Sequence, residues 1–273
     1  KMTLAEKIGQ LNQINGFDDA ARASLQQGQI GSILNLSSAL TTPNPSPAVV
    51  VEAANAVQRM AVNETRLGIP LLFGRDVIHG FRTTFSIPLA MAATWSPAAV
   101  EHAAQIAADE ATSQGVKWTF SPMVDIARDP RWGRVAEGAG EDPYLGAAIA
   151  VAAVRGYQGD DLADPQRMLA CAKHFVAYGG AHGGRDYESV DMSMRTLRDV
   201  YLPPYHAAVQ AGVATLMSSF NDLNGIPMSG NHDLLTDLLR AEWGFKGFVV
   251  SDWRSVAELI GHGVVADLYE AAE

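Results

Sequence analysis

Short apolar runs alternate with longer stretches of helical periodicity along this chain, and this alternation limits the fold more than any other feature. Strands that alternate with helices in the sequence form parallel sheets that are covered by those helices. The chain is therefore expected to be an α/β protein built from repeated strand and helix units. The apolar runs lie at residues 30–35, 69–76, 117–125, 168–175, 214–221 and 247–253.

The stretches between the runs carry the signals of helix starts. Several begin with Ser, Asp or Asn followed by Pro or an acidic residue, and the side-chain oxygen of such a first residue accepts a hydrogen bond from a free backbone N–H. The start of the chain, KMTLAEKIGQ, is typical of an amphipathic helix, and the last helix is expected to run through to the end of the chain. The helical stretches are residues 46–64, 96–114, 142–158, 195–212, 231–243 and 255–273.

The chain has 273 residues, close to the roughly 250 that a closed (β/α)8 barrel of the TIM type needs. We therefore predict a single barrel domain over residues 1–273. A full barrel has eight strands, and only six runs are visible, so the sequence predicts a barrel that is truncated before its last strands.

Charge and composition exclude several classes of function. A formal net charge of −10 argues against nucleic acid or an anionic membrane as a partner and suits a small neutral substrate. No apolar run approaches the roughly 18 residues of a membrane span. The single cysteine, Cys171, cannot form an intrachain disulfide and is expected to be a small buried strand residue.

Polar side chains stand at the carboxyl end of nearly every expected strand. In a parallel barrel these ends converge on one mouth, where the active site is built, so residues far apart in the sequence are expected in one pocket. The alternative for any single position is a helix cap, but six such positions in register favour the mouth. They are Asn35, Asp76, Asp125, Lys173 with His174, Asn221 and Asp252.

Two arginine-rich loops follow these strands. In GRDVIHGFR, the carboxylate of Asp76 can accept hydrogen bonds from two adjacent sugar hydroxyls, and Arg82 can orient it, although a structural Asp–Arg pair is equally consistent with the pattern. In DIARDPRWGRVAEGAGEDPYLG we expect Arg134 to contact a ligand. The other charges of that loop, Arg128, Asp129, Glu141 and Asp142, are expected to hold the loop together.

Lys173 and His174 are adjacent at a strand end, where the lysine is either a Schiff-base nucleophile of the aldolase type or a hydrogen-bond donor to substrate hydroxyls. The histidines lie on separate segments without the spacing of a metal site, so neither a metal ion nor a cofactor is expected.

In VVSDW, Asp252 fits the nucleophile of a retaining glycosidase, and Trp253 can provide an apolar wall against the sugar face. The alternative is that Asp252 caps the helix that follows.

Five ordered motifs carry a resemblance that covers nearly the whole chain. GRDVIHGFR, DPRWGRVAEGAGEDPYL, KHFVAYGG with GGRDYESVDMS, NDLNGIPMSGNHDLLTDLLRAEWGFKG and VVSDW together resemble the N-terminal barrel domain of glycoside hydrolase family 3, nearest its bacterial periplasmic β-glucosidase branch. The resemblance implies exo-hydrolysis of terminal β-D-glucosyl residues of β-glucosides or cello-oligosaccharides, with Asp252 as the nucleophile. It also implies sugar contacts from Asp76, Arg82, Arg134, Lys173, His174, Met217 and Trp253.

The chain departs from this family at two points. Many relatives have Tyr at the position of Phe220, whose ring has no hydroxyl to donate to Asp252. In the β-glucosidase branch the acid/base Glu lies on a following α/β sandwich domain. This domain is expected to be absent from residues 1–273 and to be the partner that completes the site.

A periplasmic or secreted bacterial location follows from the resemblance alone. The alternatives are a non-catalytic sugar-binding barrel module and a β-xylosidase or other exo-glycosidase of the same family.

Overall fold

A computed structural model of the chain describes residues 1–36 and 45–272. Seven parallel strands form its centre in two hydrogen-bonded groups, ordered β1-β2-β3-β4 and β5-β6-β9. Parallel bridges from Trp118 to Leu169 and from Met123 to Lys173 join the two groups side by side. The strands are β1 (Gln13–Asn15), β2 (Ser32–Leu34), β3 (Leu72–Arg75), β4 (Trp118–Thr119), β5 (Cys171–Phe175), β6 (Thr215–Ser218) and β9 (Phe248–Ser251).

The six predicted runs all contain a strand, and the structure adds a seventh. Strand β1 pairs in parallel with β2, with Ile14 opposite Ile33. The sequence around β1, LNQING, contains no apolar run, so periodicity could not identify it. A short antiparallel hairpin, β7 (Asp222–Leu223) with β8 (Ile226–Pro227), lies in the loop after β6 and was not predicted either.

The predicted helical stretches begin close to where the sequence places them, whereas the helices Asp19–Gln26 and Pro88–Ala92 were not predicted. The Oγ of Ser96 accepts a hydrogen bond from the N–H of Ala99, and Asp142 caps the N–H of Leu145. The helices are α1 (Leu4–Gln10), α2 (Asp19–Gln26), α3 (Pro47–Asn63), α4 (Pro88–Ala92), α5 (Pro97–Thr112), α6 (Pro143–Gln158), α7 (Met194–Thr196), α8 (Pro203–Gln210), α9 (Ser255–Gly261) and α10 (Leu268–Ala272), with π-helical η5 (Leu197–Tyr201) and η7 (Asp233–Glu242) and short 3₁₀ turns η2 (Val135–Glu137), η3 (Tyr178–Gly180), η4 (His182–Gly184) and η6 (Met228–Gly230).

The prediction of one continuous helix over residues 255–273 is wrong. Helix α9 ends at Gly261, and α10 begins only at Leu268. Gly263 lies between them with a φ of 73°, a left-handed conformation that glycine adopts at little cost and that ends a helix. The sequence signal was present in the two glycines of LIGHGV.

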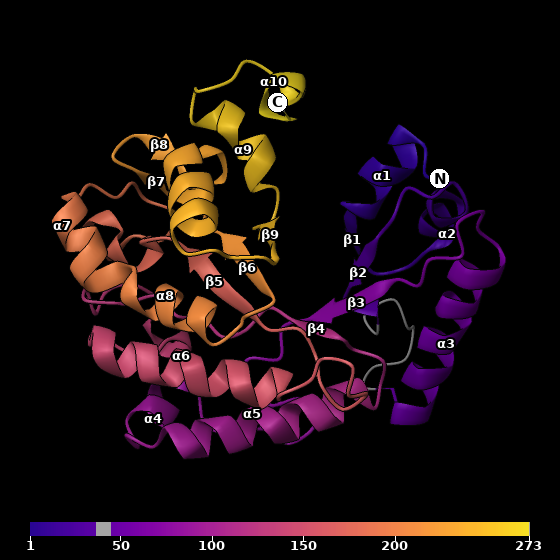
Figure 1. The fold of residues 1–273 in the computed structure, drawn as a ribbon, viewed down its shortest axis with the longest axis horizontal. Coiled ribbons are helices and arrows are strands. Elements are labelled where there is room, and N and C mark those ends of the chain that lie inside the picture. The colour runs from indigo at the N-terminus through magenta and orange to yellow at the C-terminus, as the bar shows by residue number, and fades with distance from the viewer. Residues whose placement is uncertain (37–44, 273) are drawn as a thin grey trace.

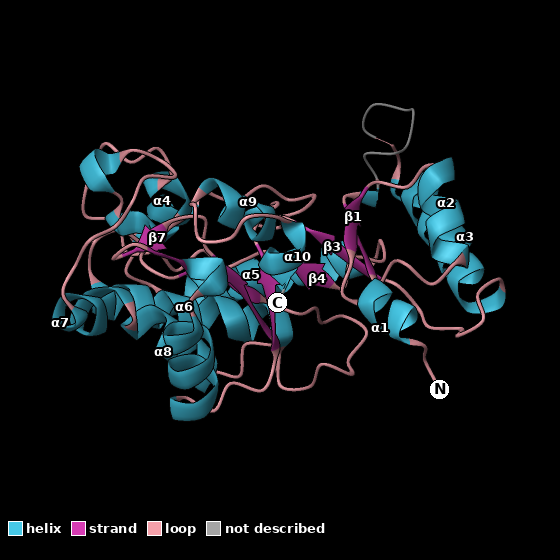
Figure 2. Ribbon diagram, turned by 90° about the horizontal axis from the view of Figure 1, so that it is seen from above, coloured by secondary structure: helices cyan, strands magenta, loops and turns pink. Residues whose placement is uncertain are grey.

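Helices cover the outer side of the strands, as expected for a barrel, except between β1 and β9, where the set is open (Figures 1 and 2). Helices α5 and α6 bury their alanine-rich faces in the largest apolar cluster together with β5 and β6. A second cluster lies inside the strands and consists of Trp118, Phe120, Cys171 and Met217. Trp118 donates from Nε1 to the Oγ1 of Thr215, 2.9 Å away, so the interior has a fixed floor beneath the carboxyl ends. Cys171 is buried, as predicted.

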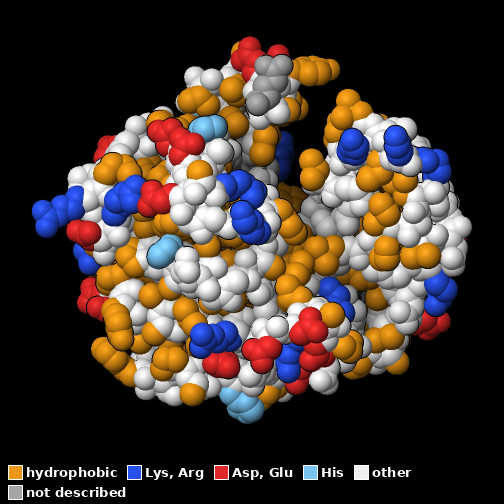
Figure 3. All heavy atoms as spheres, in the orientation of Figure 1, with side chains coloured by type: hydrophobic (Ala, Val, Ile, Leu, Met, Phe, Trp, Pro, Cys, Tyr) orange, Lys and Arg blue, Asp and Glu red, His pale blue; other side chains and the backbone are white. Residues whose placement is uncertain are grey.

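Strands β1 and β9 are the two outer edges of this set within the ranges described. A cavity of about 660 Å³ lies between them, lined by Gln13 and Ile14 on one side and by Phe248 and Val250 on the other. Figure 3 shows the surface hollowed at this place. No helix within residues 1–36 and 45–272 combines the length and the apolar character needed to cross a membrane.

Candidate active site

The carboxyl ends of the strands enclose one cavity of about 540 Å³. Seven of the eight predicted site residues line it, and they come from the ends of β3, β5, β6 and β9 and from the loop after β4. The parallel register explains why they meet, because the carboxyl ends of parallel strands lie on the same rim. These seven residues are Asp76, Arg134, Lys173, His174, Met217, Asp252 and Trp253.

Arg82, the eighth, does not reach the cavity. Its guanidinium donates to Oε1 of Gln114, 2.9 Å away, and to the carbonyl oxygen of Pro45. The carboxylate of Glu110 accepts hydrogen bonds from the backbone N–H groups of Arg82 and Thr83, which holds this loop against the end of α5. The prediction that Arg82 orients Asp76 is therefore corrected, since a lysine takes that place.

Lys173 and Asp76 form the ion pair of the cavity. The Nζ of Lys173 lies 2.9 Å from Oδ1 of Asp76, and the lysine side chain is 5% exposed whereas the carboxylate is 46% exposed. A Schiff-base nucleophile needs a neutral amine, and a carboxylate partner favours the charged one. The geometry thus makes Lys173 a donor and leaves Asp76 open to accept hydrogen bonds from a ligand.

Arg134 is held on the opposite wall. Its Nε and Nη2 atoms donate to the two oxygens of Glu137 at 2.7 and 2.9 Å, and its guanidinium lies 5.6 Å from the ring centre of Tyr178. Burial alone would raise the pKa of Glu137, but the hydrogen bonds and charge of Arg134 outweigh burial and lower it. Burial also works against the charge on Arg134, and Glu137 more than compensates, so the pKa of Arg134 lies above its ordinary value.

Asp252 follows β9 directly, and its two oxygens have different surroundings. Oδ1 accepts a hydrogen bond from the N–H of Trp253 at 2.7 Å. Oδ2 is buried and has no hydrogen-bond partner among the described residues. The side chain does not cap α9, whose N-cap is Arg254 without a side-chain bond. The helix-cap alternative is therefore excluded, and one buried carboxylate oxygen of this cavity-lining residue is left without a hydrogen bond.

His174 lies between Asp252 and a buried carboxylate. Its Nε2 atom is 3.6 Å from Oδ2 of Asp252, and its Nδ1 atom is 2.9 Å from Oδ2 of Asp125. Burial lowers the pKa of His174, and the hydrogen bond and charge of Asp125 offset only part of that effect. The imidazole is therefore neutral at neutral pH.

Three other strand-end residues were predicted at the mouth but do not line this cavity. Asp125 lies beneath it, 2% exposed, behind His174. Asn221 is buried and donates from Nδ2 to the carbonyl oxygens of Val176 and Asp222. Asn35 has a φ of 54° and lies beside Asn15. The prediction that Asn35, Asp125 and Asn221 line the cavity is therefore wrong.

The structure also identifies lining residues that sequence reasoning missed. Tyr187 is 60% exposed with a φ of 66°, and its ring packs on Phe220 at 4.9 Å between ring centres. Glu258 extends from α9 into the lining and adds a third carboxylate to those of Asp76 and Asp252. The motif GGRDYESVDMS contained the signal for Tyr187, but Glu258 sits on a helix with no local signal. Phe220, which the sequence already placed near Asp252, also lines the cavity, and the remaining new lining residues are Gln13, Leu34, Phe120 and Ser251.

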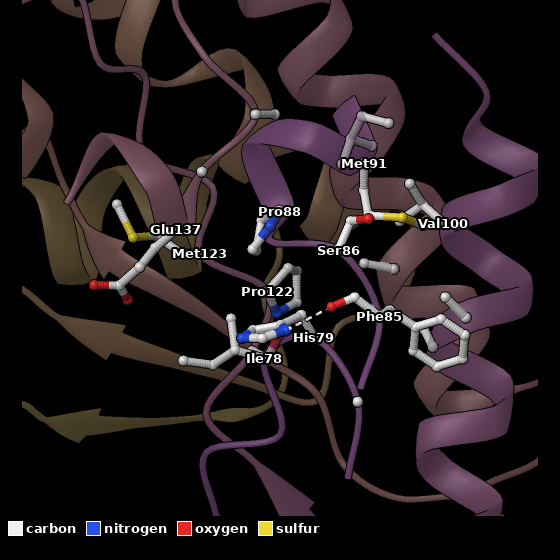
Figure 4. Close-up of a pocket in the computed structure, with 18 of the residues that line it drawn as sticks. Ile78, His79, Phe85, Ser86, Pro88, Met91, Val100, Pro122, Met123 and Glu137 are labelled. Atoms are coloured by element: carbon white, nitrogen blue, oxygen red, sulfur yellow. Dashed lines mark hydrogen bonds between the residues drawn. The ribbon is translucent and has the colours of Figure 1, made fainter. Parts of the chain in front are cut away.

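A smaller cavity of about 60 Å³ lies behind this site (Figure 4). His79, which the sequence placed near Asp76, lines it and approaches the carbonyl oxygen of Phe85 at 3.0 Å through Nδ1. Figure 4 shows that the Glu137 carboxylate points away from His79. His79 therefore belongs to the packing behind the wall, whereas Glu137 serves Arg134.

Comparisons with known proteins agree on one family. Residues 3–272 match the profile of the glycosyl hydrolase family 3 N terminal domain. A periplasmic beta-glucosidase of Salmonella typhimurium is 42% identical over 99% of this chain and 34% of its own length. A putative beta-xylosidase of Formosa agariphila is 36% identical over the whole chain and 38% of its own length.

Solved structures give the same result. The structure of a beta-glucosidase from Listeria innocua in complex with glucose superposes with a TM-score of 0.88 and 42% identity. It covers 100% of this chain and 39% of the Listeria chain. The chain thus spans between 34% and 39% of the length of these three proteins.

The pair of Arg134 and Glu137 predicts a pH-dependent stability. Because the pKa of Glu137 is lowered in the folded chain, the stabilisation by the pair is present above the carboxyl's ordinary pKa and is lost as the pH falls through the folded value. We expect Glu137→Gln to lower the free energy of unfolding by about 1–2 kcal/mol at pH 7 and by less at an acidic pH below the carboxyl's ordinary pKa. Urea denaturation at both pH values measures this. An equal loss at both would contradict it.

Proposed function

The chain belongs to glycosyl hydrolase family 3, and from this premise we propose that it forms the sugar-binding and nucleophile-bearing part of a retaining, exo-acting β-glucosidase. The observation that carries the proposal is Asp252, which lines the cavity at the end of β9 and has one carboxylate oxygen bonded to a backbone N–H and the other buried without a hydrogen-bond partner among the described residues. Strand-end carboxylates in such a mouth suit attack on the anomeric carbon of a bound sugar.

The surrounding residues offer different kinds of contact to a terminal glucosyl residue. Asp76 offers acceptor oxygens, and Lys173 and Arg134 offer donors at the wall. Trp253 is 59% exposed at the rim and can stack on a sugar face, while Met217 supplies an apolar contact at the floor. A polyhydroxylated neutral ligand can use all of these groups together, which supports a sugar over a single charged ligand.

The reaction would proceed in two displacements. The free oxygen of Asp252 forms a bond to the anomeric carbon while the glycosidic bond breaks, and an acid gives its proton to the leaving oxygen. Water then attacks the same carbon, gives a proton back to that group acting as base, and releases Asp252 with the β configuration retained. No step in this sequence needs a group beyond two carboxyls and water.

The second carboxyl is proposed to come from the α/β sandwich domain that follows the barrel in this branch of the family. In support, the chain spans little more than a third of its relatives' length. In the same way, a periplasmic or secreted location is proposed from the Salmonella relative, which is named for the periplasm. Both statements concern the whole protein.

Removal of the nucleophile gives the first test. In the full-length protein, Asp252→Ala is expected to reduce hydrolysis of 4-nitrophenyl β-glucoside by about 10⁴-fold or more, because no covalent intermediate can form. Added azide should restore release of nitrophenol and yield the α-glucosyl azide, since the small anion attacks from the vacated side. Asp237→Ala, an exposed aspartate, is the matched control. Unchanged turnover in Asp252→Ala would contradict the proposal.

Glu258 gives the second test, because it is the one lining carboxylate without an assigned role. If the acid comes from the second domain, Glu258→Gln should leave hydrolysis of both cellobiose and 2,4-dinitrophenyl β-glucoside within a few-fold. A selective loss on cellobiose, whose leaving group needs a proton, would instead identify Glu258 as the acid.

The Formosa relative supports a β-xylosidase as the second candidate. Glucose and xylose differ in the hydroxymethyl group at C5, which a site for glucose accommodates and binds. We expect a higher kcat/KM for 4-nitrophenyl β-D-glucoside than for the β-D-xyloside in the same preparation. The reverse order would transfer the assignment to xylosidase without changing the role of Asp252.

A further inference from the structure

The buried carboxylate of Asp125 is not among the proposed sugar contacts, but both of its oxygens have hydrogen-bond partners in the protein. Its Oδ2 atom accepts the backbone N–H of His174 at 3.0 Å and lies 2.9 Å from Nδ1 of the same histidine. The hydroxyl of Tyr205, from α8, lies 2.8 Å from Oδ1 and 2.6 Å from the carbonyl oxygen of His174 and donates to these acceptors. Asp125, His174 and Tyr205 are each 2% exposed or less.

These contacts decide where the proton of a neutral imidazole resides. An ionised carboxylate only accepts hydrogen bonds, so the short contact between Oδ2 of Asp125 and Nδ1 of His174 requires the proton on Nδ1. The other nitrogen, Nε2, then carries a lone pair. That atom faces Oδ2 of Asp252 at 3.6 Å.

The free oxygen of Asp252 follows from the same arrangement. Nε2 has no proton to donate to Oδ2, and Phe220, which also lines the cavity, has no hydroxyl. This accounts for a buried Oδ2 without a partner. A hydrogen bond to a carboxylate stabilises its charge and reduces its tendency to form a new bond, so an unbonded oxygen is the more reactive one.

We propose that Asp125 is a positioning residue for the reaction: it holds the proton of His174 on Nδ1, so that Nε2 cannot donate to the attacking oxygen of Asp252 and instead accepts a hydroxyl proton from the bound sugar. The inference rests on the proposed function for its catalytic consequence. The position of the proton, however, can be measured whether or not the protein hydrolyses a glucoside.

Other charges also act on His174 and bear on its protonation. The positive charges of Lys173 and Arg134 disfavour a positive charge on His174, whereas the carboxylates of Asp125 and Asp252 favour it. Glu137 neutralises Arg134 nearby, and the ring of Tyr178 packs edge to face on the imidazole at 5.2 Å. Burial prevails and lowers the pKa of His174, so the imidazole gains its second proton only at a lower pH than an ordinary histidine does. Below that point Nε2 gains a proton, bonds to Asp252, and activity is expected to fall.

The test reads the proton by ¹⁵N NMR of the full-length protein labelled at histidine, with His174→Gln used to assign the signals. The proposal expects Nε2 of His174 at the chemical shift of an unprotonated nitrogen and Nδ1 at that of a protonated one. The reverse pattern in the parent protein overturns it.

Asp125→Ala should move the proton to Nε2 in part or in full, and lower kcat about 10-fold or more with a smaller change in KM. Unchanged shifts in that variant also overturn it.

Asp125→Asn is the conservative variant, and it provides a test of the proposal even if Asp125→Ala fails to fold. The backbone N–H of His174 keeps the amide oxygen in the place of Oδ2, and the amide NH₂ then faces Tyr205, whose hydroxyl can accept it. The proton should stay on Nδ1 while the negative charge is lost, so His174 should titrate at a lower pH and the acid limb of kcat/KM should move with it. A purely structural role for Asp125 predicts no movement of either.

Asp129→Ala is the matched control, because this carboxylate lies in the same loop but pairs with Arg131 and not with His174. Its histidine signals and its pH profile should equal those of the parent protein. Equal shifts in Asp129→Ala and Asp125→Ala would mean that loop disturbance, rather than the carboxylate, moves the proton, and would overturn the proposal. Absence of glucosidase activity with the expected shifts would refute the proposed function and leave the proton assignment intact.

Discussion

The parallel pairing of seven strands is the constraint on which the rest of the structure depends. Hydrogen bonding in the order β1-β2-β3-β4 and β5-β6-β9 brings every carboxyl end to one rim. Side chains from residue 76 to residue 253 can therefore share a cavity of about 540 Å³. The apolar cluster beneath it, with Trp118 hydrogen-bonded to Thr215, forms the floor under these ends.

Above that floor, the charged groups are held by one another before any ligand enters. Lys173 is paired with Asp76, Arg134 with Glu137, and His174 with Asp125. Preorganisation of this kind spares the site the reorganisation that binding would otherwise require. In Asp252, by contrast, one buried oxygen has no hydrogen-bond partner among the described residues, which fits a group that acts on a ligand.

Sequence reasoning succeeded where a local pattern reports directly on burial. The apolar runs predicted six strands, and their polar ends predicted four of the lining residues: Asp76, Lys173, His174 and Asp252. It failed where the answer depends on distant partners: β1 is polar and is recognised only by its pairing with β2, and Arg82 is held by Gln114 on α5. Asp125 looked like a mouth residue, because a sequence does not tell whether a strand-end carboxylate faces a cavity or a neighbouring histidine.

If Asp252 attacks the sugar, the covalent intermediate can be trapped on its side chain. The full-length protein would be incubated with an activated 2-deoxy-2-fluoro-β-glucoside, whose glycosyl-enzyme intermediate hydrolyses slowly, and then analysed by intact mass spectrometry and peptide mapping. We expect one fluoroglucosyl group, attached to Asp252 in the peptide that contains VVSDW. A label on another carboxylate, or no label from a protein that binds the sugar, would contradict it.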